Sequence, residues 1–375
     1  MQYTLKYEVT KAEIDRVEKE ISDLRAALSL SNSKLADREA KIVALEAEVL
    51  ALKAQLAAQP PPPVNPPPPP PTGSHPRLYT AGGKLYTRNG EEVQLRGIEL
   101  MILTDVLNVG PVEIAKRCKA LGANTISPLF RASSSSAAAV QAWCDAAKAE
   151  GLIIGVNADH ISGGRAWLCK PEIVAVCNAC PHVFLECEVE TDEVQDGDDA
   201  RWIAGVKSLI DDLRAAGHKS IIKVGAPQGG RRVEFPLKSG AQVVNLDPLK
   251  QVVFTFQAYW KESTAGSQWY QNCAGVAAGL AGTKQALTKC AQSGLCFIPG
   301  FDWEDDIGTT GELALMDHAH SLGLSYQHWA LTGDGGLPGN NLIDRFDWTV
   351  SLASTTPNGQ AIKAKMTANR QFKAL

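Results

Sequence analysis

The chain has 375 residues, of which 45% are hydrophobic and 21% are charged, so it can bury a sizeable core and is long enough for more than one domain. A formal net charge of −4 and the lack of any Lys/Arg cluster argue against a nucleic-acid partner. The first residues, MQYTLKYEVTKAEID, carry charges where a signal peptide needs an apolar core, and no apolar run is long enough for membrane insertion.

The N-terminal part reads as an oligomeric stalk. Residues 1–10 alternate as a short strand does, and we expect them to act as a docking peg. Residues 11–59 repeat apolar side chains at a seven-residue step, which predicts a coiled coil. The first seam consists of Ile14, Ile21, Leu28, Leu35, Ile42, Val49 and Leu56. Mixed Ile and Leu at the seams permits two or three strands, and we favour a homotrimer.

A polyproline linker follows at residues 60–75, with prolines at 60–63 and 66–71. Such a run cannot continue a helix and extends by roughly 3.1 Å per residue. We therefore expect a semi-rigid spacer on the order of 35–40 Å long. The alternative, a ligand for SH3 or WW domains, stays open.

Residues 76–375 form a second domain, in which short apolar runs alternate with helical stretches, as in repeated βα units. The predicted strands lie at 92–100, 124–130, 152–159, 183–190, 220–227, 252–260, 295–303 and 324–331. Eight strands in this length predict the α/β class, as a (β/α)8 TIM barrel. A hairpin over 77–93, turning at Asn89-Gly90, is expected to close its bottom.

Several of these segments resemble glycoside hydrolase family 5 and its wider clan of cellulases and mannanases. LYTRNGEEVQLRGIEL, KALGANTISPLFR and AEGLIIGVNADH are similar to that family's opening hairpin with first strand, its second strand and its third. PHVFLECEVETD, VVFTFQAYW and GLSYQHWAL resemble its fourth, sixth and eighth strands. The resemblance covers residues 77–350 and implies a sugar-binding groove at the carboxyl ends of the strands.

The resemblance also implies two catalytic carboxylates, one protonating the leaving oxygen and one attacking the sugar. Glu190 falls at the position of the family's acid/base, with Val189 and Thr191 in place of its Asn and Pro. On strand seven, Gly300 or Phe301 occupies the place of the nucleophile, and Asp302 and Glu304 are the nearest carboxylates.

Further candidates would bind substrate. Glu186, Glu188 and Glu190 share one side of their strand, where neighbouring carboxylates should raise one another's pKa if that side faces inward. An acidic stripe that is merely solvated or paired with Arg is the alternative. The substrate-binding candidates are Glu188, Gln257, Tyr259, Trp260, Trp303, Trp329 and His160. Of these, Tyr259 and Trp329 match the family, Gln257 replaces its His, and Asp159-His160 reverses its His-Asp order; Ser127 also stands where it has Arg.

Other aromatic and basic residues have less specific interpretations. Trp143 and Trp202 lie in predicted helices and are expected in the core. Trp167 and Trp269 lie in predicted loops and could serve either purpose. Arg231 and Arg232 could hold an acidic sugar, or belong to a solvated loop.

All nine cysteines lie in the second domain. CNAC at 177–180 has metal-ligand spacing, but no second Cys pair or close His pair accompanies it, so we expect no metal and no cofactor. Buried thiols, or disulfides pairing Cys169 with Cys177 or Cys180 and Cys273 with Cys290, are equally compatible.

An oligomeric stalk, a stiff tether and a sugar-groove barrel together favour a bacteriophage virion fibre. The protein would lie at the virion surface, with its N-terminus docked on a virion structural protein and its barrels bound to host-surface polysaccharide. Under this interpretation the barrel could have kept the sugar groove and given up hydrolysis. One alternative is an active retaining glycosidase that depolymerises capsule or cell-wall glycan. Another is a purely structural appendage.

Overall fold

The structure is a computed structural model that describes Lys19 and residues 75–100, 110–158, 163–187, 199–230, 232–258, 279–302, 308–329 and 357–368. The chain divides into two units, Met1–Pro66 and Pro67–Leu375. Apart from Lys19, the predicted docking peg, coiled coil and polyproline linker lie outside the described residues.

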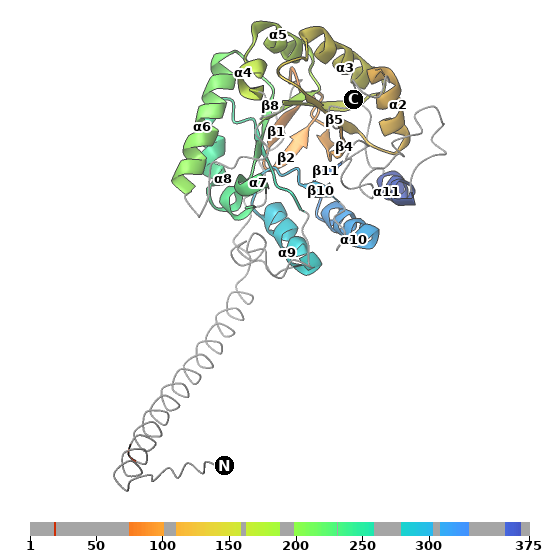
Figure 1. Ribbon diagram of the computed structural model, residues 1–375, viewed down its shortest axis with the longest axis vertical. Coiled ribbons are helices and arrows are strands. Elements are labelled where there is room, and N and C mark those ends of the chain that lie inside the picture. The colour runs from red at the N-terminus through yellow and green to blue at the C-terminus, as the bar shows by residue number, and fades with distance from the viewer. Residues whose placement is uncertain are drawn as a thin grey trace, which may run out of the picture. The chain divides into compact units, whose positions relative to one another are not determined.

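Within the described residues, the second unit contains the predicted parallel barrel, with helices around the strands (Figure 1). Its strands are β4 (Arg96–Leu100), β5 (Thr125–Phe130), β6 (Ile153–Ala158), β7 (Val183–Cys187), β8 (Ile221–Gly225), β9 (Val252–Thr255), β10 (Gly300–Asp302) and β11 (Tyr326–Trp329). They pair in the order β10-β11-β4-β5-β6-β7-β8-β9. The α/β TIM-barrel prediction is therefore confirmed.

Single bridges close the ring between its first and last strands. Phe254 of β9 pairs in parallel with Phe297, and Gln257 pairs with Gly300 of β10. Backbone hydrogen bonds from Ile298 N to Phe254 O at 2.8 Å and from Ala258 N to Gly300 O at 2.7 Å span the same seam. Each strand consequently has a partner on both sides.

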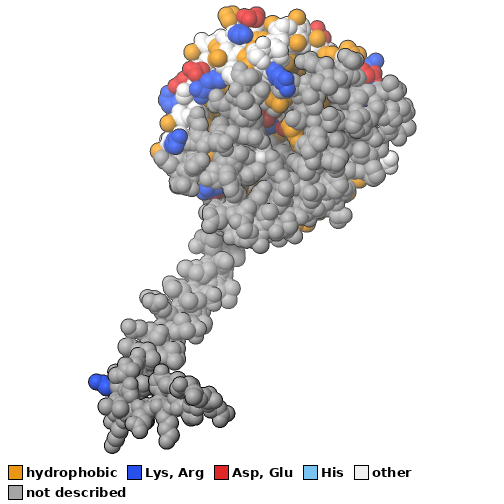
Figure 2. Space-filling model, viewed as in Figure 1, with side chains coloured by type: hydrophobic (Ala, Val, Ile, Leu, Met, Phe, Trp, Pro, Cys, Tyr) orange, Lys and Arg blue, Asp and Glu red, His pale blue; other side chains and the backbone are white. Residues whose placement is uncertain are grey.

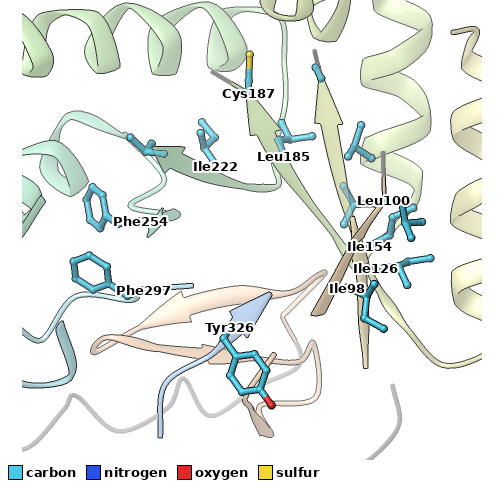
Figure 3. Close-up of a cluster of buried hydrophobic side chains, with 14 of the residues drawn as sticks. Ile98, Leu100, Ile126, Ile154, Leu185, Cys187, Ile222, Phe254, Phe297 and Tyr326 are labelled. Atoms are coloured by element: carbon cyan, nitrogen blue, oxygen red, sulfur yellow. The ribbon is translucent and has the colours of Figure 1, made fainter. Parts of the chain in front are cut away.

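Side chains alternate between the two faces of the strands, as the two-residue period of a strand requires. The outward residues form the main core between strands and helices, as Figure 3 shows for Ile98, Ile126, Ile154, Leu185 and Ile222. The inward residues build the barrel interior. This alternation decides which charged side chains of the strands meet inside the barrel.

An antiparallel sheet covers the amino-terminal end of the interior. It consists of β1 (Tyr79–Ala81), β2 (Lys84–Tyr86) and β3 (Glu92–Val93). Its apolar side chains pack on the lowest inward residues of the barrel, in a cluster of Leu78, Leu85, Val93, Leu95, Ile153, Phe184, Ile221, Val253, Cys296 and Ile298. The predicted hairpin at the bottom is confirmed, and Gly90 in its turn has a φ of +80°. The run predicted as one strand over 92–100 is instead two, because β3 belongs to this sheet and β4 to the barrel.

The described helices surround the barrel (Figure 1). They are α2 (Pro111–Ala120), α3 (Ala137–Ala149), α4 (Gly164–Leu168), α5 (Pro171–Ala179), α6 (Asp199–Ala215), α7 (Pro227–Gly230), α8 (Glu234–Leu246), α9 (Gly279–Gln292), α10 (Gly308–Ser321) and α11 (Pro357–Ala368). Trp143 of α3 and Trp202 of α6 are buried in the main core, as predicted. Trp167 of α4 is also buried, stacks on Phe130 and donates to the Ser135 carbonyl at 2.9 Å, so its role is structural.

The outer surface is mixed in charge. Figure 2 shows basic and acidic side chains interspersed over the coloured part of the visible face. None of the helices in the described parts of the chain has the length and apolarity that crossing a membrane requires.

Candidate active site at the carboxyl ends of the strands

Active sites of TIM barrels lie at the carboxyl ends of the strands. The structure brings three of the predicted site residues to this end. Asp302 ends β10 and its backbone is paired with that of Trp329, which ends β11. Gln257 follows β9 and is joined to β10 by the bridge to Gly300. The side chains of Gln257 and Trp329 are both partly exposed.

The remaining predicted site residues belong to the segments that follow the strands. Glu188, Glu190, Glu304, Tyr259, Trp260, Trp303 and His160 lie outside the described residues, as do Trp269 and Arg231. Their assignments stay predictions. Arg232 is described and forms an ion pair with Glu234, so part of its charge is already matched within the chain.

Glu186, the first member of the acidic stripe, points into the barrel. It is fully buried on β7. Ser127 of β5, which stands where the family has Arg, donates a hydrogen bond from its hydroxyl to Glu186 Oε2, and the two oxygens lie 3.1 Å apart. The stripe is therefore not a solvated edge at this position.

Lys223 of β8 is the centre of the polar interior. Its ammonium donates to Glu186 Oε1 of β7, to Gln327 Oε1 of β11, and to Glu99 Oε1 of β4 at 3.2 Å. Lys223, Glu186 and Gln327 are fully buried, and Glu99 keeps 14% of its side chain exposed. We call these four residues with Ser127 the interior cluster.

The interior cluster has more acidic than basic groups, because one ammonium serves two carboxylates. Burial disfavours the Lys223 ammonium, but Glu186 and Glu99 outweigh that effect and raise the pKa of Lys223 above its ordinary value. Burial, together with the nearby Glu186 charge, outweighs Lys223 and raises the pKa of Glu99 to about 7. Glu99 can therefore take up or release a proton near neutral pH.

Glycines leave room for the cluster. A Cβ placed on Gly97 would lie 2.5 Å from Gln327 Cγ, and one on Gly155 would lie 2.6 Å from Phe184 Cζ and closer still to Ser127 Oγ. Real Cβ atoms essentially never come under 3.0 Å of such atoms. The middle of the barrel is therefore filled by a few long polar side chains, packed against strand positions with no side chain.

The interior cluster can hold charge and relay a proton, but it offers no set of metal ligands. Within the described ranges, no group of three His, Cys, Asp or Glu side chains is placed to bind a metal ion. Of the two alternatives left open for the cysteines, the structure has free thiols at the described positions, and Cys169 is not paired with Cys177 or Cys180. Cys273 lies outside the described residues.

Lys223, Glu99 and Gln327 were not among the site residues predicted from the sequence, although they are partners of Glu186 or of one another. A signal was present, because Lys223 interrupts the apolar run SIIKVGAP and Glu99 interrupts RGIEL. In a strand buried on both faces, a lone charge needs a partner on another strand. The period of the strand gives its face, but pairing across the barrel depends on register, which one sequence does not supply.

Comparison with known proteins places this barrel beside β-mannanases. No protein-family model matches the sequence. A mannan endo-1,4-beta-mannosidase of Streptomyces lividans is 30% identical over 139 residues, which span 36% of this chain and 32% of that protein. The chain thus matches about a third of the length of that relative.

Solved structures match over more of the chain. The mannohexaose complex of Thermomonospora fusca β-mannanase has a TM-score of 0.63 at 21% identity, covering 80% of this chain and 98% of that one. The catalytic domain of a mannanase from Streptomyces sp. SirexAA-E has a TM-score of 0.62 at 21% identity, with 81% and 95% covered. A GH5 cellulase from an Icelandic hot spring isolate has a TM-score of 0.55 at 17% identity, with 80% and 97% covered. At these identities the likeness establishes the fold.

These comparisons correct the prediction of a virion fibre. The matched proteins named above are mannanases and a GH5 cellulase, which favours the alternative of a glycoside hydrolase over that of a fibre. The fibre interpretation is wrong because it rested on the stalk and linker, and an oligomeric tether is as compatible with an enzyme as with a virion.

Proposed function

We propose that this chain is a retaining glycoside hydrolase that cleaves the backbone of a β-1,4-linked mannan. The observation that carries the proposal is the pairing of a complete barrel, matching 98% of a β-mannanase chain, with 30% identity to a mannan endo-1,4-beta-mannosidase over 139 residues. The sequence identity matters most, because the fold alone hosts many activities.

In this proposal Glu190 is the acid/base and Asp302 or Glu304 is the nucleophile. The acid/base protonates the oxygen of the leaving sugar while the nucleophile attacks the anomeric carbon, and water then releases the glycosyl-enzyme. The pairing of the Asp302 and Trp329 backbones supports this arrangement, since it puts a carboxylate-bearing residue beside the proposed aromatic sugar platform.

The interior cluster supports the same proposal from below the site. Glu186 of β7 lies four positions before Glu190 in the sequence. Its ties to Lys223 and Ser127 fix that strand against β8 and β5. A fixed strand holds the residues that follow it in a defined direction, which a positioned acid/base requires.

We also propose that the heptads of residues 11–59 make the enzyme oligomeric, with a trimer favoured. Several barrels on one stalk would raise avidity for a polymeric substrate without a new contact in any single site. Light scattering on the full chain tests this, and a monomeric mass would contradict it.

The function is tested by release of reducing ends from β-1,4-mannan by the full chain, with carboxymethyl cellulose as a second substrate. We expect release from mannan, and proton NMR should show that the first product keeps the β-configuration. Glu190→Gln should lower kcat by about 10²–10⁴-fold. Glu172→Gln, on the exposed face of α5, is the matched control and should keep full activity.

Asp302→Asn and Glu304→Gln decide between the two nucleophile candidates. Replacing the true nucleophile should lower kcat to a similar degree as Glu190→Gln does. Full activity in Glu190→Gln, or binding of mannan with no release by the unmodified chain, would contradict the proposal. Release from cellulose but not from mannan would refute the substrate while keeping the reaction type.

A further inference from the structure

A second group of reactive side chains lies at the opposite end of the barrel from the candidate active site. Cys144 belongs to α3, and Cys180 and His182 lie in the connection between α5 and β7. Here Leu78 N of the bottom sheet donates to the Pro181 carbonyl at 2.8 Å. All three side chains lie within the described residues, and none is used by the proposed hydrolysis.

The side chain of Cys180 contacts both of the other side chains. His182 Nε2 lies 3.3 Å from Cys180 Sγ and 3.3 Å from the Cys144 carbonyl oxygen. A side-chain hydrogen bond also joins Cys144 to Cys180. Cys144 is 1% exposed, and Cys180 and His182 are 5% and 6% exposed, so all three are buried and Cys180 is the more exposed of the two cysteines.

The surroundings favour a thiolate on Cys180 and a thiol on Cys144. The hydrogen bonds from Cys144 and His182 outweigh burial and lower the pKa of Cys180 to about 5. The same Cys144–Cys180 bond, with burial, raises the pKa of Cys144 above its ordinary value. A thiolate beside a neutral thiol is the arrangement of an attacking and a resolving cysteine.

Charged and titratable groups face the pair from three elements. Cys177 of α5 and Asp145 of α3 add to the repulsion that keeps Cys144 protonated. Arg77, just before β1, is electrostatically coupled to Cys177 and Cys180, and it is held in place by donating to the Asn178 carbonyl at 3.1 Å. Asp145 and Cys177 thus favour the neutral form of Cys144, whereas Arg77 favours negative charge on Cys177 and Cys180.

From these contacts we infer that Cys144 and Cys180 form a peroxide-reactive dithiol, which closes to a disulfide between α3 and the α5–β7 connection. Cys180 thiolate attacks one oxygen of hydrogen peroxide, the O–O bond breaks, Cys180 becomes a sulfenic acid, and the hydroxide that leaves takes up a proton from solvent to become water. Cys144 then attacks the sulfenic sulfur of Cys180, the S–O bond breaks, and the Cys144 proton leaves with that oxygen as water. Two thiols are oxidised and one peroxide is reduced.

The test treats the native full chain with hydrogen peroxide, blocks remaining thiols with N-ethylmaleimide under unfolding conditions, and maps the peptides by mass spectrometry. We expect a Cys144–Cys180 linked peptide that disappears on reduction. Cys118 and Cys290 serve as controls within the same chain, because they are fully buried and burial raises the pKa of each. They should be recovered as thiols.

Variants separate the two roles. Cys144→Ser should accumulate a sulfenic acid on Cys180 that dimedone traps, whereas Cys180→Ser should leave Cys144 reduced. His182→Asn should slow the reaction at pH 7, by up to about 30-fold if the pKa of Cys180 returns to that of an ordinary thiol. The inference is overturned by a disulfide between Cys177 and Cys180, by equal oxidation of Cys118, or by a pair that stays reduced.

Discussion

Replacing Lys223 with Met should destabilise the barrel by about 3–5 kcal/mol, because it removes one partner of a buried ion pair. The Lys223 and Glu186 side chains are both 0% exposed, and Glu99 is 14% exposed. The variant would leave the Glu186 and Glu99 carboxylates without the ammonium from which both accept. Met is close to Lys in length and is apolar, so the loss of packing volume should be a minor part of the cost.

Urea unfolding followed by tryptophan fluorescence measures this effect in the full chain. All eight tryptophans lie between Trp143 and Trp348, so the signal comes from the barrel domain and not from the stalk. With a urea dependence of about 3 kcal/mol per molar, a loss of about 4 kcal/mol lowers the midpoint by roughly 1.3 M. Lys148→Met, at an exposed position of α3, is the matched control and should stay within about 0.5 kcal/mol of the unmodified chain.

A double-mutant cycle with Glu186→Gln shows whether the loss comes from the stranded charge. The combined Lys223→Met and Glu186→Gln variant should be more stable than the sum of the single losses implies, by about 1–3 kcal/mol, because the amide that replaces the Glu186 carboxylate has no charge to leave unpaired. A loss under about 1 kcal/mol in Lys223→Met, or strict additivity of the two changes, would refute the reasoning.

Three further predictions concern the interior and its upper rim. Glu99→Gln should flatten the pH dependence of stability. The Glu99 carboxyl has a pKa of about 7 in the folded chain, against an ordinary value of 4.5, so its protonation stabilises the fold in full below pH 4.5. This contribution to the free energy of unfolding, roughly 3 kcal/mol, is lost as the pH rises through 7. Chemical denaturation at pH 5 and pH 8 measures it, and parallel curves for variant and parent would contradict it. Gly155→Ala should cost about 1–3 kcal/mol in urea unfolding through its clash with Ser127, and an unchanged midpoint would argue against the close packing. Trp329→Ala should raise KM for mannan about tenfold with a smaller change in kcat, and an unchanged KM would remove it from the sugar site.

Much of the barrel was predictable from the sequence, because a strand buried on both faces leaves an apolar run between helical segments. The runs around Ile154, Leu185 and Ile222 were found in this way, and their side chains form the main core. The division of residues 92–100 was not predictable, since alternation continues through Gln94 and Leu95. Only the three-dimensional pairing assigns Val93 to the bottom sheet and Arg96 to the barrel.

The candidate site was less predictable than the fold. Asp302 and Trp329 could be placed at strand ends because strand ends follow from the apolar runs, and their backbones are paired. Lys223 and Glu99 are 124 residues apart, and nothing local in either strand names the other as its partner. The prediction of a virion fibre was wrong for a different reason, because it gave the heptad pattern and the linker more weight than the resemblance of the barrel to mannanases.

The position of the interior cluster argues that it serves the strand ends above it more than the stability of the barrel. The lowest inward layer is apolar, and residues such as Phe184 and Val253 already pack against the bottom sheet. An apolar middle layer of equal volume would usually be as stable as a buried ion pair or more so. A barrel used only as a spacer would therefore gain nothing from Lys223 with two carboxylates, whereas an enzyme gains a firmly held β7, the strand that leads to Glu190. Stability and hydrolysis should consequently separate in Lys223→Met with Glu186→Gln, which should keep much of the fold and lose activity on mannan.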